Sequence, residues 1–366
     1  MGNNEALTLE GVRWGEFFIS DVAEIISGYD INDDEKQQGN YPYISSSSMN
    51  NGISHFVSNI NETLEADCIS VCRTGSVGYA FYHPYEALYS NNCRKLRLHH
   101  RGKYAALFIA NQITSQRERY NYGYIMGTAR LMRQKILLPA DESGRPDYAF
   151  MERFMRNIEQ RLIRAYVGQV SVRLRNTPPQ KLLSLCGITW GNFFISDVAE
   201  IISGRDIYDD ERVSGSIPYI GSSALNNGIT HFISNTNETQ ESECISVNRN
   251  GSVGYAFYHP YEALYSNDCR KIRPRVKDKY AALFIATQIT AQKDKYSYGY
   301  KMGTARLMRQ KIMLPVTPSG TPDWQLMHSY MLSLETHHLS AVLTHFTAKL
   351  HRAYNLPQNS QGEISS

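Results

Sequence analysis

Residues 14–28 read WGEFFISDVAEIISG, and residues 190–204 read WGNFFISDVAEIISG. The same offset of 176 residues relates GSVGYAFYHPYEALYSN at 75–91 to an unchanged copy at 251–267. This period is too long for a solenoid, whose structural repeats span about 20–45 residues. Each copy is therefore a domain, and two such domains in one chain favour a pseudo-two-fold arrangement.

Each copy is followed by a segment in which apolar residues recur at about every fourth position, beginning after Asp147 and Asp323. This spacing predicts an amphipathic helix in both places. Prolines 178 and 179 end the first helical pattern and Pro357 ends the second. We therefore expect a first domain over 1–147, a helical segment over 148–180, a second domain over 181–323, a second helical segment over 324–356 and a disordered tail over 357–366.

The two predicted helices admit two hypotheses. In the favoured one, they pair antiparallel with each other and set the distance between the domains. In the other, each helix simply packs on its own domain.

Inside each copy the pattern indicates a mixed α/β (α+β) fold. Strand-like and short helical signals open the domain over Phe17–Ile26, and Cys68–Val71 is a short apolar strand. A Gly-Ser turn leads to a second expected strand, Val77–Tyr82. Helical periodicity follows over Tyr104–Arg119, and a last strand is stopped by Pro139.

The composition excludes several classes of protein. Hydrophobic residues make up 42% and charged residues 20% of the chain, which is typical of an ordinary globular protein rather than a disordered one. No apolar run is long enough for a transmembrane helix, and the first residues lack the apolar core of a signal peptide, so we expect a cytoplasmic protein without a membrane partner. The six cysteines are too few for a disulfide scaffold, and we expect reduced, mostly buried thiols.

The motifs of the common catalytic classes are missing. The sequence contains no GxxxxGK[ST] phosphate loop, no HExxH zinc motif and no GxSxG elbow, and it lacks the GxG loop and NPPY-type tetrapeptide of methyltransferases. Asp21 with Asp34 and Lys36 loosely fits a nuclease spacing, but the second copy has Arg212 in place of Lys36. We therefore expect no catalytic residues and no metal site in this chain.

Groups that contact nucleic acid are abundant instead. The chain has 25 tyrosines and a net charge of only +3, which suits DNA binding through local basic surfaces. Arg and Lys neutralise phosphates, and Arg also reads base edges. For a single residue an ordinary solvated charge is the alternative. The basic residues that recur beside glycines or follow a predicted strand are Arg73, Arg94, Lys95, Arg130 and Arg133, with Arg249, Arg270, Lys271, Arg306 and Arg309 in the second copy.

Chemically sharp differences between the copies cluster near Arg73 and Arg249. Because the backbones should superpose, differences in DNA preference must come from such side chains, and we expect Arg73 and Arg249 to touch DNA in both halves. Neutral drift on exposed loops is the alternative. The facing pairs are Tyr29 and Arg205, Asn32 and Tyr208, Cys72 and Asn248, and Thr74 and Asn250.

The sequence resembles the specificity subunits of type I restriction–modification systems and of the related type IIB systems with a separate recognition subunit. The resemblance extends over nearly the whole chain, and no single motif carries it alone. It rests on the WGxFFISDVAEIISG motif at 14 and 190, PYI with the later NNGI, the RxGSVG turn at 73 and 249, KIxLP at 135–139 and 311–315, and GxPD at 144–147 and 320–323.

This resemblance implies two target-recognition domains, each reading half of a bipartite, roughly inverted-repeat DNA target, with antiparallel helices as the spacer. The helical segments are shorter than in typical type I subunits, which leaves a long spacer in doubt. It also implies that S-adenosylmethionine and Mg²⁺ belong to partner methyltransferase or methyltransferase–endonuclease subunits, which we expect in two copies. Those partners would dock on the outer helix face at Arg153, Arg156, Arg161 and Arg164, for which a solvated face is the alternative.

Two other functions stay open at this point. One is a stand-alone DNA-binding or anti-restriction protein of the same fold. The other is a small-molecule enzyme with two equal sites, built on His83 and His259 or on His55 and His231.

Overall fold

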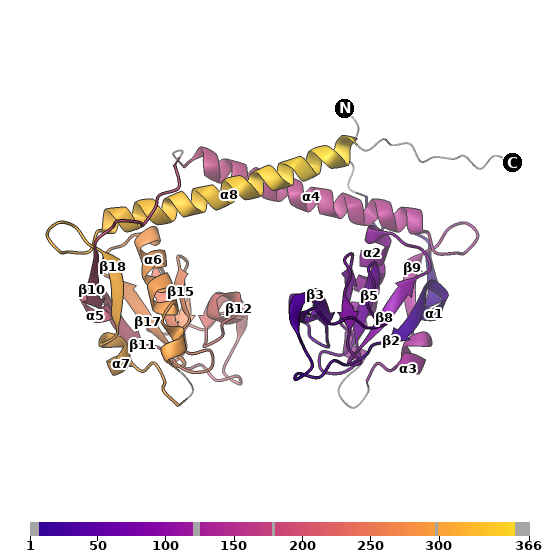
Figure 1. Cartoon of the computed structure of the whole chain (residues 1–366), viewed down its shortest axis with the longest axis horizontal. Coiled ribbons are helices and arrows are strands. Elements are labelled where there is room, and N and C mark those ends of the chain that lie inside the picture. Colours follow the sequence, from indigo (N-terminus) through magenta and orange to yellow (C-terminus); the bar gives the residue numbers. More distant parts are fainter. Residues whose placement is uncertain (1–6, 120–124, 178–179, 297–298, 356–366) are drawn as a thin grey trace. The chain divides into compact units, whose positions relative to one another are not determined.

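The computed structural model describes residues 7–119, 125–177, 180–296 and 299–355. The chain divides into two compact units, Met1–Tyr166 and Val167–Ser366. Each unit contains one copy of the repeat, with helices and strands mixed (Figure 1). The predicted pair of α+β domains, each followed by a long helix, is confirmed. The antiparallel pairing and the two-fold relation stay predictions.

The two copies have the same elements in the same order. The first consists of β1 (Trp14–Phe18), α1 (Ile19–Val22), β2 (Ala23–Ser27), β3 (Gln38–Ile44), η1 (Asn50–Gly52), β4 (Ile53–Val57), β5 (Cys68–Cys72), β6 (Ala80–His83), β7 (Leu88–Tyr89), β8 (Cys93–Leu98), α2 (Lys103–Thr114), η2 (Arg117–Arg119), α3 (Thr128–Met132), β9 (Lys135–Pro139) and α4 (Tyr148–Arg175). The second consists of β10 (Trp190–Phe194), α5 (Ile195–Val198), β11 (Ala199–Ser203), β12 (Ser214–Ile220), η3 (Asn226–Gly228), β13 (Ile229–Ile233), β14 (Cys244–Asn248), β15 (Ala256–His259), β16 (Leu264–Tyr265), β17 (Cys269–Pro274), α6 (Lys279–Thr290), η4 (Lys293–Lys295), α7 (Thr304–Met308), β18 (Lys311–Pro315) and α8 (Trp324–Asn355).

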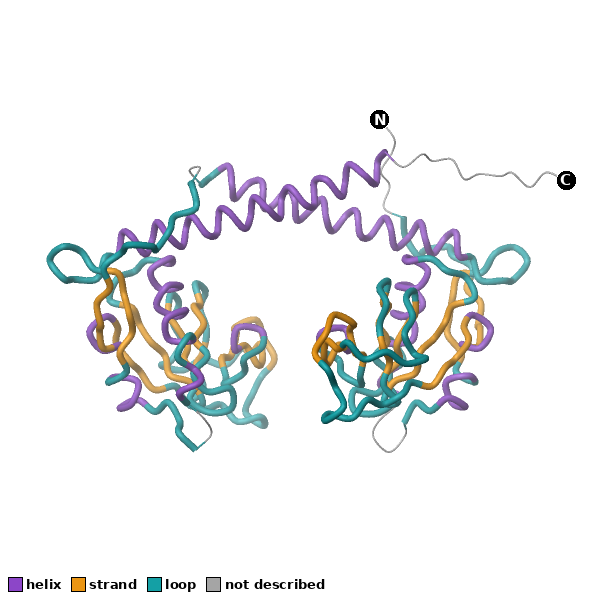
Figure 2. Tube along the Cα trace, in the orientation of Figure 1, coloured by secondary structure: helices purple, strands orange, loops and turns teal. Residues whose placement is uncertain are grey.

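Three small sheets build each domain (Figure 2). In the first copy an antiparallel sheet has the order β2-β8-β5-β6, a second has the order β4-β3-β7 with β3 and β7 parallel, and β1 pairs with β9. The second copy repeats this topology strand for strand. The loops that join the four-stranded sheet to its neighbours therefore occupy equivalent places in both domains.

Helix α2 forms the core with the four-stranded sheet. Its apolar residues Phe108, Ile109 and Ile113 are buried, as are Ile69 and Leu96 of the sheet. All of the described cysteines except Cys186 are buried, which confirms the expectation of mostly buried thiols.

The turn after β5 is longer than predicted. The strand expected over Val77–Tyr82 begins only at Ala80, because Gly75 and Gly78 adopt positive φ values of 56° and 84°. A side chain at position 78 would place its Cβ only 2.9 Å from the Arg117 Cα atom, so glycine is required there. Helix α2 also ends earlier than Tyr104–Arg119 implied, since a 3-10 turn follows Thr114.

The predicted starts of both long helices are confirmed. Asp147 and Asp323 cap them, accepting hydrogen bonds from the backbone N–H of Phe150 at 2.8 Å and of Leu326 at 2.9 Å. Prolines 178 and 179 and the tail over 357–366 lie outside the described residues.

Each long helix packs on its own domain near its start. The Tyr104 hydroxyl donates to Glu159 of α4 at 2.7 Å, and the Tyr280 hydroxyl donates to Glu335 of α8 at 2.6 Å. At its other end α4 also reaches α8 within the second unit, through an ion pair between Arg173 and Glu335. One observed contact therefore supports pairing of the two helices, and others support packing of each helix on its own domain.

Candidate nucleic-acid interface

Five loops meet at one end of the first domain, and we call residues 28–30, 45–47, 73–76, 90–92 and 125–128 the first loop cluster. The backbone N–H of Arg73 donates to the Asn92 carbonyl at 2.9 Å, and that of Met126 donates to the Arg73 carbonyl at 3.3 Å. The other two loops are joined by the Asn91 N–H, which donates to Asp30 at 2.9 Å, and by the Ser46 hydroxyl, which donates to the Thr74 carbonyl. The cluster adjoins α3, which lies at the end of the domain remote from α4 (Figure 1).

The second domain has the equivalent arrangement. Residues 204–206, 221–223, 249–252, 266–268 and 301–304 form the second loop cluster, in which Arg205 bonds Tyr265 at 2.8 Å and Arg249 bonds Asp268 at 2.9 Å. The repeat thus produces two equivalent surfaces, one per domain.

A glycine allows the loops to approach closely. A Cβ atom on Gly28 would lie 2.0 Å from the carbonyl oxygen of Ser90, and one on Gly204 would lie 2.0 Å from that of Ser266. These distances are far below van der Waals contact, so the close approach of the two loops requires glycine at these positions.

Two arginines lie close together at each cluster, and none of the four forms a salt bridge with a carboxylate among the described residues, although the charges of Asp206 and Asp268 act on Arg270. Arg94 is buried, and its guanidinium donates to neutral groups only, including the Thr128 hydroxyl at 2.7 Å and the Asn91 carbonyl at 3.0 Å. Burial, and next the charge of Arg73, lower the pKa of Arg94. Two positive charges held together in this way favour the arrival of an anion such as phosphate.

The less buried member of this pair is Arg73. It is half-buried, one guanidinium nitrogen reaches the Asn91 carbonyl at 3.5 Å, and its Nε atom is buried without a partner among the described residues. Arg249 is placed in the same way, 3.3 Å from the Asn267 carbonyl, and its charge lowers the pKa of Arg270 after the larger effect of burial. The geometry therefore makes Arg73 and Arg249 the groups available to a ligand.

The prediction that Lys95 and Lys271 contact DNA is wrong. The Lys95 side chain is 2% exposed, with its ammonium group 2.7 Å from Glu65, and Lys271 has the same exposure and lies 2.6 Å from Glu241. Sequence proximity to Arg94 suggested the role, but the strand buries these lysines in ion pairs. They stabilise the domain and cannot reach a ligand.

Three further predicted contacts need correction, because burial withdraws their side chains from the surface. Arg94 and Arg270 are each only 6% exposed and hold loops together. Asn248 is 0% exposed, and its amide donates to the Ser223 carbonyl at 2.9 Å. These residues position the loop clusters instead of touching bases.

The other predicted contacts stay predictions, and the structure places them as follows. Tyr29, Asn32, Arg205 and Tyr208 are exposed, although Arg205 forms an ion pair with Glu238 at 3.0 Å. Thr74 and Asn250 lie on the turns after Arg73 and Arg249. Arg130 and Arg306 belong to the short helices α3 and α7 and are half-buried. Arg133 and Arg309 directly follow these helices and are exposed.

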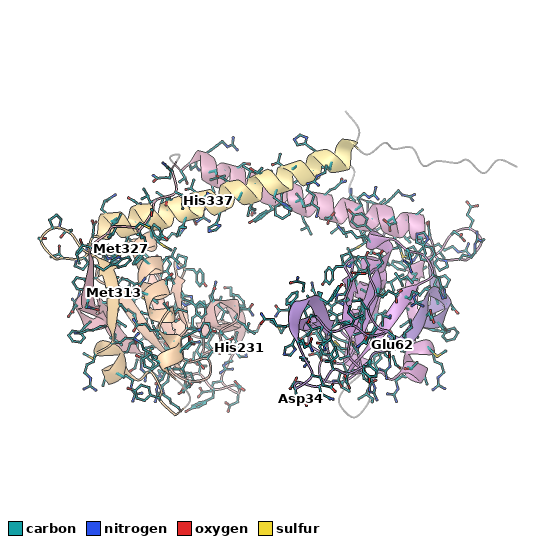
Figure 3. The ribbon with its side chains drawn as sticks, viewed as in Figure 1. Asp34, Glu62, His231, Met313, Met327 and His337 are labelled. Carbon is teal, nitrogen blue, oxygen red and sulfur yellow. The ribbon has the colours of Figure 1, made fainter. Side chains whose placement is uncertain are left out.

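A cavity of about 340 Å³ opens in the second loop cluster, and Asp206, Arg212, His231 and Asp268 are among its lining residues. Figure 3 shows His231, which belongs to β13 and lies 3.4 Å from Arg212. Its polar lining could accept a polar group from a bound partner.

One wall of this cavity depends on a matched pair of residues. Position 221 is glycine because a Cβ atom there would lie 2.7 Å from the Thr230 methyl group. The first copy has Ser45 and Ser54 at these two positions. Ser54 lacks that methyl group, so the first domain can hold a side chain where the second cannot.

The histidines proposed for a small-molecule enzyme do not form an accessible site. His83 is 0% exposed, and its Nε2 atom lies 2.8 Å from the Ser70 hydroxyl; His259 and Ser246 repeat the arrangement. Burial lowers the pKa of both histidines to about 4. These sealed Ser–His pairs have no route to a substrate.

The residues of the loose nuclease pattern have local structural roles. Asp21 accepts a hydrogen bond from the Phe18 backbone N–H at 2.8 Å at the start of α1, and Lys36 forms an ion pair with Asp33 at 2.5 Å. Within the described residues, no group of three or more His, Cys, Asp or Glu side chains is placed to hold a metal ion. The described part of the chain also contains no helix that is long and apolar enough to cross a membrane.

The arginines predicted to dock a partner lie on the part of α4 that belongs to the first unit. Arg153, Arg156 and Arg161 are exposed, and Arg164 is half-buried. Helix α8 has no matching set, because Ser329, Leu332, His337 and Ser340 occupy the equivalent positions; Figure 3 shows His337 on that helix. The arginine surface is therefore present on α4 and absent from α8. Two partner copies that each dock on such a surface would need one on both helices.

Sequence reasoning missed two residues of the loop clusters. Asn92 and Asp268 are exposed and receive the backbone hydrogen bonds of Arg73 and Arg249. They are a chemically sharp difference between the copies, so the comparison at the offset of 176 residues could have found them.

Comparisons with known proteins agree with this organisation. The family model of the type I restriction modification DNA specificity domain matches twice, at residues 11–165 and 187–345. The type II restriction enzyme specificity subunit S.BcgI of Heyndrickxia coagulans is 31% identical over 333 residues, which cover 88% of this chain and 95% of that protein.

Among solved structures, the type I restriction–modification S subunit of M. genitalium covers 95% of this chain and 96% of its own, at 16% identity and a TM-score of 0.49. The HsdS subunit of Thermoanaerobacter tengcongensis covers 96% and 97%, at 14% identity and a TM-score of 0.33. Because the family model matches both copies and the relative from Heyndrickxia coagulans matches nearly end to end, the chain belongs to the type I restriction–modification DNA specificity domain family, as a specificity subunit with two copies of that domain.

Proposed function

We propose that each domain recognises one half of a bipartite double-stranded DNA target through its loop cluster. The observation that carries this proposal is a pair of neighbouring arginines in each cluster, Arg73 with Arg94 and Arg249 with Arg270, whose charges lower the pKa of the buried member. Bringing like charges together costs free energy in the free protein. A phosphate or an electronegative base edge would offset that cost on binding.

The chain then directs a partner methyltransferase or methyltransferase–endonuclease subunit to the target. In this proposal the partner holds S-adenosylmethionine and Mg²⁺, and the reactions take place there. Membership of the specificity family and the sealed histidine pairs support this division of labour. Co-purification of a methyltransferase with the chain would distinguish it from a stand-alone DNA-binding protein.

Replacing Arg73 with alanine is expected to weaken DNA binding by about 5- to 150-fold, because one good arginine–base pairing contributes about 1–3 kcal/mol. Arg249→Ala should have a similar effect, and each variant should relax selectivity in one half-site only. Gel-shift titration of the full chain with its selected duplex would measure both effects.

Arg145→Ala is the matched control, since this arginine is 79% exposed and lies outside both loop clusters. It should change affinity by less than about twofold, as expected for a solvated surface charge. Unchanged binding by the folded Arg73→Ala and Arg249→Ala variants would show that the loop clusters are not the DNA site.

The arginines of α4 are expected to contact the partner subunit. Reversing Arg153, Arg156, Arg161 and Arg164 to glutamate should weaken assembly by about 100-fold, since each exposed charge contributes up to about 1 kcal/mol. Size-exclusion chromatography with the co-purified partner would show the loss, with circular dichroism as a check on folding. The neutral variant with four glutamines should fall between the two, and full assembly of the reversed variant would place the docking surface elsewhere.

A further inference from the structure

The two loop clusters differ at one position whose backbone is fixed in the same place. The N–H of Arg73 donates to the Asn92 carbonyl at 2.9 Å, and the N–H of Arg249 donates to the Asp268 carbonyl at 2.9 Å. Both side chains are exposed beside the arginine that we assign to DNA. A difference between Asn92 and Asp268 is therefore a difference in chemistry at one point of the interface.

In the first cluster, the side chain of Asn92 offers hydrogen-bond donors. The Thr74 hydroxyl donates to the amide oxygen of Asn92 at 3.2 Å. The amide nitrogen has no hydrogen-bond partner among the described residues. The group left available is consequently an N–H donor, adjacent to the positive charge of Arg73.

In the second cluster, the equivalent group is an acceptor. The Asn250 amide nitrogen donates to one carboxylate oxygen of Asp268. The other carboxylate oxygen has no partner among the described residues, and the Asn250 amide oxygen is buried and unpaired. A carboxylate can only accept hydrogen bonds. The pair Thr74–Asn92 is thus replaced by a pair that reverses the hydrogen-bond polarity of the surface.

We propose that Asn92 and Asp268 determine specificity by this reversal, an inference that rests on the proposed function. Base edges in the major groove differ in the same way, because guanine presents acceptors at O6 and N7 whereas cytosine presents the N4 amino donor. Asp268 selects a cytosine in the second half-site and rejects guanine by repulsion. Asn92 selects an acceptor-bearing base, such as guanine, at the corresponding place in the first.

A consequence is that the target departs from a perfect inverted repeat at this position. The other differences between the clusters do not exchange a donor for an acceptor in this way. Arg205, which replaces Tyr29, is for instance paired with Glu238. Burial and then the charge of Arg249 lower the pKa of Arg270, and the charges of Asp206 and Asp268 partly oppose this effect, whereas no carboxylate of the first copy acts on Arg94 in this way.

The test exchanges the two pairs in the full chain. One variant carries Thr74→Asn with Asn92→Asp, and the other carries Asn250→Thr with Asp268→Asn. Each new pair occurs in the other copy on the same backbone, so both variants should fold, and thermal unfolding checks this. Every chain is then incubated with a pool of random DNA duplexes, and the bound sequences are read.

The wild type should select cytosine at one position of the second half-site and an acceptor-bearing base at the equivalent position of the first. The Asn250→Thr, Asp268→Asn variant should prefer an acceptor-bearing base over that cytosine by at least fivefold and leave the first half-site unchanged. The Thr74→Asn, Asn92→Asp variant should prefer cytosine at the equivalent position of the first half-site and leave the second unchanged. Exchange of Arg145 and Thr321, a pair that differs between the copies outside both loop clusters, should alter neither half-site.

Unchanged half-sites in folded variants, or loss of all selection by them, would overturn the role of Asn92 and Asp268 while leaving DNA recognition intact. Identical wild-type half-sites would overturn it as well. If the wild type selects no sequence at all, the proposed function fails and this inference fails with it.

Discussion

Replacing Glu65 with glutamine is expected to lower the free energy of unfolding of the first domain by about 3–5 kcal/mol, because it leaves a buried lysine without its counter-charge. Glu65 lies 2.7 Å from the Lys95 ammonium group, whose side chain is 2% exposed, and it also binds Arg97 at 2.6 Å. The hydrogen bond from Arg97, followed by that from Lys95, lowers the pKa of Glu65 to about 2 against the opposing effect of burial. Urea unfolding of the full chain would measure the change.

Glu24→Gln provides the matched control for this prediction. Glu24 binds the same Arg97 at 2.6 Å, but its side chain is 57% exposed, so its loss should cost less than about 1 kcal/mol. Glu241→Gln should reproduce the large effect in the second domain, where Lys271 is equally buried. A loss below about 1 kcal/mol for both Glu65→Gln and Glu241→Gln would contradict this account of the ion pairs.

Acidification from pH 6.5 to pH 4 is expected to destabilise each domain by about 3 kcal/mol through its buried histidine. Burial lowers the pKa of His83 and of His259 from 6.5 to about 4, so between these values the unfolded chain binds the extra proton and the folded chain does not. The stabilisation is fully present above pH 6.5 and is lost as the pH falls towards 4. Unfolding measured at several pH values would show this slope.

The double variant His83→Gln, His259→Gln should show a much flatter dependence over that range, whereas replacement of the exposed His55 by glutamine should leave it unchanged. Glu65 and Glu241 act at lower pH, since their pKa of about 2 in the folded chain lies below the ordinary glutamate value of 4.5. An equally steep slope in the double histidine variant would assign the acid sensitivity to other groups.

The sequence predicted best those features whose causes are local. The repeat located both domains, and the aspartates at 147 and 323 cap their helices through hydrogen bonds to residues only three positions away. The turn after β5 was harder to place. The sequence pattern predicts a strand there. The positive φ values of Gly75 and Gly78, and the close approach of Arg117 to position 78, depend on the folded backbone and have no signal in that pattern.

The errors in the candidate site have a common physical reason. Strand β8 is buried on both faces, so the alternation that normally separates inward from outward side chains is absent from CRKLRL. The partner of Lys95 is Glu65, which lies thirty residues earlier and on no regular element. The local sequence therefore does not distinguish a lysine in a buried ion pair from a lysine that contacts a phosphate.

The matched pair at Gly221 and Thr230 restricts the order in which the two domains can have diverged. A serine at position 221 would place its Cβ atom 2.7 Å from the Thr230 methyl group. Thr230 would have to move, although its hydroxyl donates to the Tyr219 carbonyl at 3.1 Å. A serine at position 230, as at Ser54 in the first copy, removes the obstacle. A path of single substitutions between the two modern pairs that avoids this contact therefore passes through glycine at the first position and serine at the second.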